Sequence, residues 1–253
     1  MRGAALLIAL FAGLGLRAQA PLEQFTPGRF AASDGALLPY RLLKPAAIEA
    51  GRTYPLILQL HGSGAIGTDN EGQIGPFSNG WLLPAMRSSY AAFVLVPQFS
   101  ARTVEYPAVA EPALLRSTPT PLLAWAYALV EKIAREFPID RSRIYVVGFS
   151  MGASSALQAL IARPDLFAAA MAIAAVPPDT SRLPTAPILM IHGDADTENP
   201  FAAARAWSQS MKSKGADVEF RSVPGLQHEL PPDLPNATWW RDWLFSKRRA
   251  PSK

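Results

Sequence analysis

The stretch RIYVVGFSMGASSALQAL, residues 143–160, is the clearest indication of the fold in this sequence. It opens with an apolar, β-branched run of strand length, Arg143–Val147, and passes into a helical pattern over Met151–Arg163. The sequence Gly148–Gly152, which reads G-x-S-x-G, joins the two directly. A sharp strand-to-helix turn of this kind projects its serine oxygen above a sheet, and the flanking glycines leave room for it. We therefore predict that Ser150 is a nucleophile rather than a simple helix cap.

The same alternation of strand-length and helical runs continues along the chain, which indicates a mostly parallel sheet covered by helices. The first two strands are expected to form an antiparallel hairpin. No linker, repeat or change of composition divides the chain, so residues 21–253 are predicted to form a single domain. Expected strands are Phe25–Phe30, Leu37–Leu43, Pro55–Leu60, Ala92–Val96, Arg143–Val147, Ala168–Ala174, Ile188–Ile191 and Val218–Val223; expected helices are Leu122–Phe137, Met151–Arg163, Pro200–Lys214 and Ala237–Lys247.

Composition excludes several classes of function. The 253 residues are 49% hydrophobic and 17% charged, which is typical of a globular protein. The net charge of +4 is modest and forms no basic stripe, so no nucleic-acid partner is expected. Because the chain has no cysteine, it has no disulfide, thiolate metal site or cysteine nucleophile. We expect neither a metal nor a cofactor, and the sequence sets no oligomeric state.

The first twenty residues have the pattern of an export leader. Arg2 precedes an apolar run, Ala4–Leu16, which is short for a membrane span. Ala18–Ala20 then gives the small-x-small cleavage pattern. Pro21 disfavours a cut directly after residue 20, so cleavage one or two residues away and an uncleaved anchor both stay open. We predict a signal peptide over residues 1–20, a periplasmic or extracellular protein, and no stable membrane span after cleavage.

A serine nucleophile needs a base, and the chain has three histidines, His61, His192 and His228. In folds with this strand–turn–helix arrangement the order along the chain is serine, acid, histidine. His61 precedes the serine, and His192 precedes any suitable acid, so both fail on order. His228, in the loop after the last strand, is therefore predicted to be the base.

Two carboxylates compete for the acid position, Asp194 and Asp196, in the sequence His192–Asp196 after a predicted strand. The acid must reach His228 from the loop beyond that strand. We favour Asp196, with Asp194 holding the turn.

Two backbone N–H groups are candidates for stabilising an oxyanion. One follows the strand Pro55–Leu60, in the sequence HGSG, and the other follows the nucleophile. We assign these roles to Ser63 and Met151, with Gly64 as an alternative in a different register. His61 is expected to bond the loop rather than act in the chemistry.

Five stretches occur in an order typical of one superfamily: LHGSGAIGTDN (60–70), VPQ (96–98), IDRSRIYVVGFSMGA (139–153), HGDADTENP (192–200) and VPGLQH (223–228). With them the chain resembles secreted esterases and predicted peptidases of the α/β-hydrolase superfamily. It looks most like the group related to dienelactone hydrolases and polyhydroxybutyrate-depolymerase-type esterases.

The resemblance implies an α/β-hydrolase fold, with Asp196 as the acid and His228 as the base. It also implies that Asp69 and Asn70 shape the loop on the pocket side. The chain departs from the pattern at Ala153, where relatives often have a second glycine, and at Ser63, where alanine is common. Neither departure removes a catalytic group.

These observations predict hydrolysis of small or polymeric carboxylic esters through an acyl-enzyme. A serine peptidase with the same three residues is the alternative, and a non-catalytic binding relative is a third reading. The absence of a separate recognition domain in the sequence pattern favours esters over peptides. Two long irregular stretches, 64–80 and 98–121, are expected to wall the pocket with Phe77, Trp81, Phe99 and Tyr106, although each of these aromatics could equally belong to the core.

Overall fold

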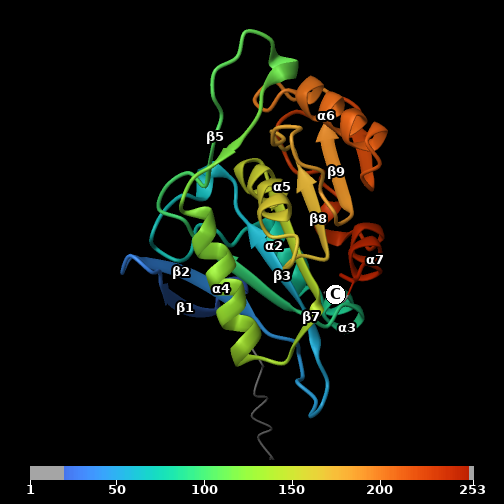
Figure 1. The fold of residues 1–253 in the computed structure, drawn as a ribbon. Helices are drawn as coiled ribbons and strands as arrows, with labels where there is room; N and C mark the ends of the chain where they lie inside the picture. Colours follow the sequence, from blue (N-terminus) through green and yellow to red (C-terminus); the bar gives the residue numbers. More distant parts are fainter. Residues whose placement is uncertain (1–19, 251–253) are drawn as a thin grey trace, which may run out of the picture.

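An eight-stranded sheet forms the centre of the protein (Figure 1). The structure, a computed structural model, describes residues 20–250. The strand order is β1-β2-β4-β3-β7-β8-β9-β10, and β2 runs antiparallel to both of its neighbours, while all other pairs are parallel. The predicted mostly parallel sheet is thus confirmed. The strands are β1 (Thr26–Ala31), β2 (Leu37–Leu43), β3 (Tyr54–Leu60), β4 (Phe93–Pro97), β7 (Ile139–Phe149), β8 (Ala169–Ile173), β9 (Ile188–Gly193) and β10 (Val218–Val223).

Helices cover both faces of this sheet because successive side chains of a strand point to opposite sides. Helices α4 (Leu123–Glu136), α5 (Met151–Ala162) and α6 (Phe201–Ser213) pack on one face. The other face carries α7 (Trp239–Phe245) and the short helices that precede β4. All residues of β3 are buried, which explains why the central strands are continuously apolar rather than alternating.

The irregular stretches contain short elements that the sequence pattern did not reveal. Before β4 these are η1 (Ser63–Ala65), α2 (Pro76–Asn79), η2 (Gly80–Leu82) and α3 (Pro84–Ser89). A two-stranded ribbon of β5 (Val104–Glu105) and β6 (Thr118–Pro119) encloses η3 (Pro112–Leu114), and the ends of the described chain add α1 (Pro21–Gln24) and η4 (Leu234–Asn236).

Most predicted boundaries agree with the structure to within one or two residues, but β7 is longer than expected. It begins at Ile139, which pairs with Tyr54, and a register shift separates this pair from the regular pairing of Leu56 with Ile144. A pattern that searches for continuous apolar character misses this irregular beginning. Helix α7 is two residues shorter than predicted at each end.

The carboxyl ends of β3, β7, β8, β9 and β10 lie along one edge of the sheet because these strands are parallel. The loops that follow them therefore meet there, although they come from distant parts of the sequence. We call this the carboxyl edge and the opposite one the amino edge.

The predicted leader falls almost entirely on residues 1–19, which lie outside the described residues. Within residues 20–250, no helix has the length and apolar character needed to cross a membrane.

Candidate active site

Ser150 lies on the sharp turn between β7 and α5, with φ 56° and ψ −121°. This left-handed conformation is strained for a residue with a side chain, and such strain is concentrated at functional sites. The glycines of the motif make the turn possible. A Cβ atom at Gly148 would lie 2.3 Å from the carbonyl carbon of Gly152, and one at Gly152 would lie 2.1 Å from the carbonyl oxygen of Leu60. Glycine is therefore required at both positions.

The structure brings together three of the predicted site residues. The Nε2 atom of His228 lies 2.8 Å from the Oγ atom of Ser150, and its Nδ1 atom lies 2.8 Å from Oδ2 of Asp196. An ionised carboxylate can only accept a hydrogen bond, so Nδ1 carries the proton and Nε2 is free to accept from the serine hydroxyl. This is the direction of hydrogen bonding that an imidazole needs to act as a general base.

Asp196 is fixed on its other side by the backbone. Its side chain has no exposed surface, and Oδ1 accepts hydrogen bonds from the N–H groups of Glu198 at 3.0 Å and Asn199 at 2.9 Å. Asp194 instead accepts the N–H of Gly225 at 2.7 Å, across the base of the loop that carries His228. Asp196 thus contacts the histidine, and Asp194 holds the turn.

His61 bonds the loops at the carboxyl edge. Its Nε2 atom accepts the N–H of Phe99 at 3.0 Å, so Nδ1 is the protonated nitrogen and donates to the carbonyl oxygen of Gly62 at 2.8 Å. Burial lowers the pKa of His61, because a charged ring would lose its hydration. The neutral ring ties the end of β3 to the end of β4.

His192 was excluded as the base by its position in the sequence, and the structure reveals a contact that sequence reasoning missed. Its ring is buried at the end of β9, with Nε2 2.9 Å from the carbonyl oxygen of Asn199 and 3.2 Å from Oδ2 of Asp196. Burial lowers the pKa of His192 as well. One feature of the sequence pointed to a structural role for His192: the dipeptide His-Gly occurs at both 61–62 and 192–193, and His61 was expected to be structural.

The two predicted oxyanion-stabilising residues are the first residues of helices, Ser63 of η1 and Met151 of α5. N–H groups in the first turn of a helix have no acceptor within that helix, which leaves them available to a ligand. The loop before η1 also lies against the nucleophile, because a Cβ atom at Gly62 would lie 3.5 Å from Cβ of Ser150. That the N–H groups of Ser63 and Met151 stabilise an oxyanion stays a prediction.

A small cavity of about 140 Å³ is lined by Phe149, the residue before Ser150, and by Gly62. Its wall includes the apolar side chains of Pro76, Phe77 and Leu230. Polar side chains also line it: Gln59, Gln73 and Ser78. An apolar cavity of about this volume can hold a benzene molecule.

Of the four aromatic residues expected to wall the pocket, Phe77 lines this cavity and the other three do not. Trp81 packs edge-on against Trp240, at 5.3 Å between ring centroids, and its indole N–H donates to Gln59. Phe99 belongs to the core on the other face, and the hydroxyl of Tyr106 bonds Oγ of Ser154 at 2.9 Å. Trp81 and Phe99 are thus core residues, and Tyr106 does not line this cavity.

Asp69 and Asn70 shape the loop after η1 through contacts with Gln98. The amide of Gln98 donates to Asp69 at 2.8 Å and accepts the N–H of Asn70 at 2.6 Å. Hydrogen bonds from the N–H groups of Glu71 and Gly72 lower the pKa of Asp69. Asn70 takes a left-handed conformation, φ 61°, which asparagine tolerates better than most residues. The loop leads from η1 to the cavity wall.

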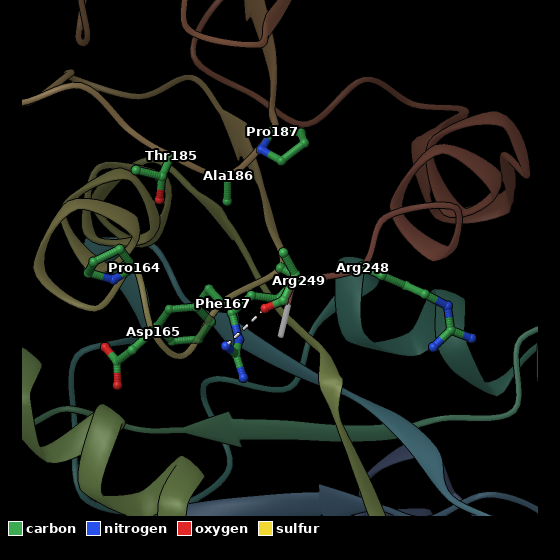
Figure 2. A pocket seen from close by; sticks show the side chains of 10 residues that line it. Pro164, Asp165, Phe167, Thr185, Ala186, Pro187, Arg248 and Arg249 are labelled. Atoms are coloured by element: carbon green, nitrogen blue, oxygen red, sulfur yellow. Dashed lines mark hydrogen bonds between the residues drawn. The ribbon is translucent and has the colours of Figure 1, made fainter. Parts of the chain in front are cut away.

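A larger cavity, of about 510 Å³, lies at the amino edge, before the first residues of β8 and β9 (Figure 2). Its wall includes Pro164, Phe167, Pro187 and Arg249. Ser150, His228 and Asp196 do not line this cavity, because they follow strands at the carboxyl edge. Within residues 20–250, no cluster of three or more His, Asp or Glu side chains is placed to hold a metal ion.

Comparison with known proteins relates the chain to esterases. Residues 126–234 match the phospholipase/carboxylesterase family. The candidate esterase NocK of Nocardia uniformis subsp. tsuyamanensis is 31% identical over 182 residues, which are 70% of this chain and 50% of NocK. A candidate carboxylesterase of Oryza sativa subsp. japonica is 27% identical over 74% of this chain and 76% of its own length. The chain thus spans about half of NocK.

Solved structures agree with this relationship. A thermostable esterase superposes with a TM-score of 0.79 and 27% identity, over 90% of this chain and 64% of its own. An acylaminoacyl peptidase superposes with a TM-score of 0.64 at 18% identity, over 91% of this chain and 43% of its own, which shows the common fold alone. The chain thus has the α/β-hydrolase fold, and the relatives that it resembles are esterases and carboxylesterases.

Proposed function

We propose that the protein is a serine esterase in which Ser150, His228 and Asp196 form a catalytic triad. The observation that carries the proposal is the continuous line of hydrogen bonds, at 2.8 Å each, from the hydroxyl through the imidazole to the buried carboxylate. Ser150 also lies on a strained turn, next to Phe149, which lines a cavity of about 140 Å³, and this position supports the same role.

The reaction begins when Oγ of Ser150 attacks the ester carbonyl carbon and His228 takes the hydroxyl proton. The carbonyl electron pair moves onto oxygen, and we assign the N–H groups of Ser63 and Met151 to donate hydrogen bonds to it. The intermediate then expels the alcohol, which receives the proton from His228. Water, with His228 again as base, attacks the acyl carbon, releases the carboxylic acid and restores Ser150.

Cavity size points to the class of ester. A volume of about 140 Å³ is well below the 300–1,000 Å³ typical of sites for drug-sized ligands. We propose that it receives a short aliphatic chain or a single ring, with the remainder of the substrate lying outside. Phe77, Phe149 and Leu230 supply the apolar contact for that group.

The proposal is tested on the purified mature protein with p-nitrophenyl esters and a fluorophosphonate probe. Wild-type protein should hydrolyse the ester and label at Ser150, whereas Ser150→Ala should lose at least about 10⁴-fold in kcat and all labelling. Ser213→Ala, which removes an exposed hydroxyl on α6, is the matched control and should behave as wild type. Turnover retained by Ser150→Ala, or no label on folded wild-type protein, would contradict the proposal.

A second measurement separates esters from peptides. The p-nitroanilide with the same acyl group presents the same carbonyl with an amine leaving group, so the ratio of the two rates isolates the bond that is cleaved. An esterase should favour the ester by orders of magnitude. A rate on the anilide equal to that on the ester would favour a peptidase.

We also propose that residues 21–253 are one catalytic domain and that residues 1–20 direct it to the periplasm or the exterior. The support for export is the sequence pattern of the first twenty residues. Intact-mass measurement of protein from the periplasm and from the medium would find a chain that begins near residue 20. A full-length chain in the membrane fraction would instead indicate an uncleaved anchor.

A further inference from the structure

Asp196 has two histidine neighbours, and the catalytic proposal uses one of them. Both His228 Nδ1, at 2.8 Å, and His192 Nε2, at 3.2 Å, approach the same carboxylate oxygen, Oδ2. The side chains of His192 and Asp196 have no exposed surface. The second contact therefore lies in a region without bulk water, where a hydrogen bond is electrostatically strong.

The protonation of His192 follows from its partners. Nε2 lies 2.9 Å from the carbonyl oxygen of Asn199, which can only accept, so Nε2 carries a proton. Nδ1 is buried and has no hydrogen-bond partner among the described residues, as suits an unprotonated nitrogen in a neutral ring. The N–H of Nε2 donates to the Asn199 carbonyl, and the same nitrogen lies 3.2 Å from Oδ2 of Asp196.

Asn199 ties this arrangement to the sheet. Its backbone N–H donates to Oδ1 of Asp196 at 2.9 Å, and its side-chain amide donates to the carbonyl oxygen of Ala174 at 2.7 Å. Ala174, directly after β8, has φ 55°, a strained conformation for alanine. The loop that carries Asp196 is thus fastened to the ends of two strands, to β8 through Asn199 and to β9 through His192.

We propose that His192 is a positioning residue that holds the Asp196 carboxylate against His228, and the proposal rests on the esterase function above. Two backbone N–H groups hold Oδ1, and the contact with Nε2 of His192 restrains Oδ2, the oxygen that His228 bonds, from a second direction. Misplacement of a catalytic group by about 1 Å costs on the order of 100-fold in rate.

The surroundings of His192 contain few other groups that could produce the same effect. The titratable groups that face it are Asp196 and His228. From α6 the ring of Phe201 packs edge-on against it, at 5.9 Å between centroids, and carries no charge. A change in catalysis on replacing His192 can therefore be traced to the Asp196–His228 pair.

The experiment compares His192→Gln with His192→Met in the full mature chain. The two side chains have similar length, but glutamine keeps an N–H donor near the position of Nε2 and methionine does not. Thermal unfolding of each variant reports the structural cost, and kcat and KM on a p-nitrophenyl ester report catalysis.

If His192 positions Asp196, the methionine variant should lose about 10- to 100-fold in kcat with little change in KM. The glutamine variant should keep most of kcat. Active wild-type protein in the same assay separates this test from that of the esterase function itself.

Two results would overturn the proposal. One is a methionine variant that folds less stably but keeps the wild-type kcat, which is what a purely packing residue gives. The other is a glutamine variant that folds and yet loses kcat as strongly as a methionine variant would. If the methionine variant does not fold, the glutamine variant still tests the proposal. Because glutamine keeps an N–H donor, the proposal requires that this variant retain most of the wild-type kcat.

Discussion

Both edges of the parallel sheet are hollowed, and they differ in what faces the hollow. The carboxyl edge has the smaller cavity, about 140 Å³, beside a hydroxyl, an imidazole and a carboxylate in hydrogen-bonding sequence. The amino edge has about 510 Å³, but its charged groups form ordinary surface pairs, such as Arg163 with Asp165 at 2.7 Å. Volume alone would favour the amino edge, whereas the arrangement of polar atoms favours the carboxyl edge.

The largest contrast is expected between two aspartates, one at each edge. Asp196→Asn should lower kcat by about 10³–10⁴-fold while the protein stays folded, because an amide no longer holds His228 in the required tautomer. Steady-state kinetics and circular dichroism check this. Asp140→Asn, which alters a carboxylate at the amino edge, is the matched control for kcat. Equal losses in both variants would mean that the edges do not differ as argued.

Phe77→Ala tests whether the small cavity sets the acyl preference. Removal of the ring should cost about 3 kcal/mol of stability and extend turnover to longer acyl chains, because the cavity deepens. A series of p-nitrophenyl esters from acetate to decanoate measures the shift. Phe245→Ala removes a ring that packs on Trp81 and Tyr145 outside the cavity, so it should destabilise the protein without changing the chain-length profile.

Asp140 is expected to contribute to stability but not to catalysis. Burial alone would raise its pKa, but hydrogen bonds from Ser142 and Arg143 outweigh that effect and lower the pKa to about 2. Because the folded value lies below the unfolded one, this stabilisation is full above pH 4 and is lost as the pH falls toward 2.

Asp140→Asn should accordingly lower the free energy of unfolding by about 1–2 kcal/mol at pH 7. The difference from wild type should shrink on acidification, which urea unfolding at several pH values would measure. A difference that stays constant from pH 7 to pH 3 would disprove the electrostatic origin.

The smallest effect is expected at Arg248, an exposed side chain that pairs with Asp140 at 3.1 Å. Arg248→Ala should change stability by no more than about 1 kcal/mol and leave kcat unchanged, since exposed ion pairs contribute little. A large loss of ester turnover would show that the cavity of Figure 2 takes part in function.

Much of the fold and the proposed triad could be predicted because the signals lie in contiguous stretches of sequence or depend only on how many residues of one type the chain contains. The strand, turn and helix around Ser150 are contiguous, so one stretch specifies them. His228 emerged by elimination among three histidines, and that argument needs no geometry. Asp196 was preferred over Asp194, and the structure places its carboxylate on His228.

Other features were inaccessible because they depend on the direction of side chains in irregular segments. Phe77 and Trp81 lie four residues apart, one lining the cavity and the other in the core, yet α2 is four residues long and too short for a periodic pattern. The approach of His192 to Asp196 is set by a loop fastened to β8 through Asn199, a contact between distant segments.

The two buried histidines, His61 and His192, also bear on the environments that the protein can tolerate. Both keep neutral rings because burial lowers their pKa below the ordinary 6.5. Unfolding exposes both rings, so below pH 6.5 the unfolded chain binds protons that the folded chain does not. The free energy of unfolding therefore decreases as the pH decreases. A protein that acts outside the cytoplasm, as proposed, cannot rely on a buffered interior. The buried rings of His61 and His192, which hold its loops in place, would then also set the pH below which the folded protein is no longer stable.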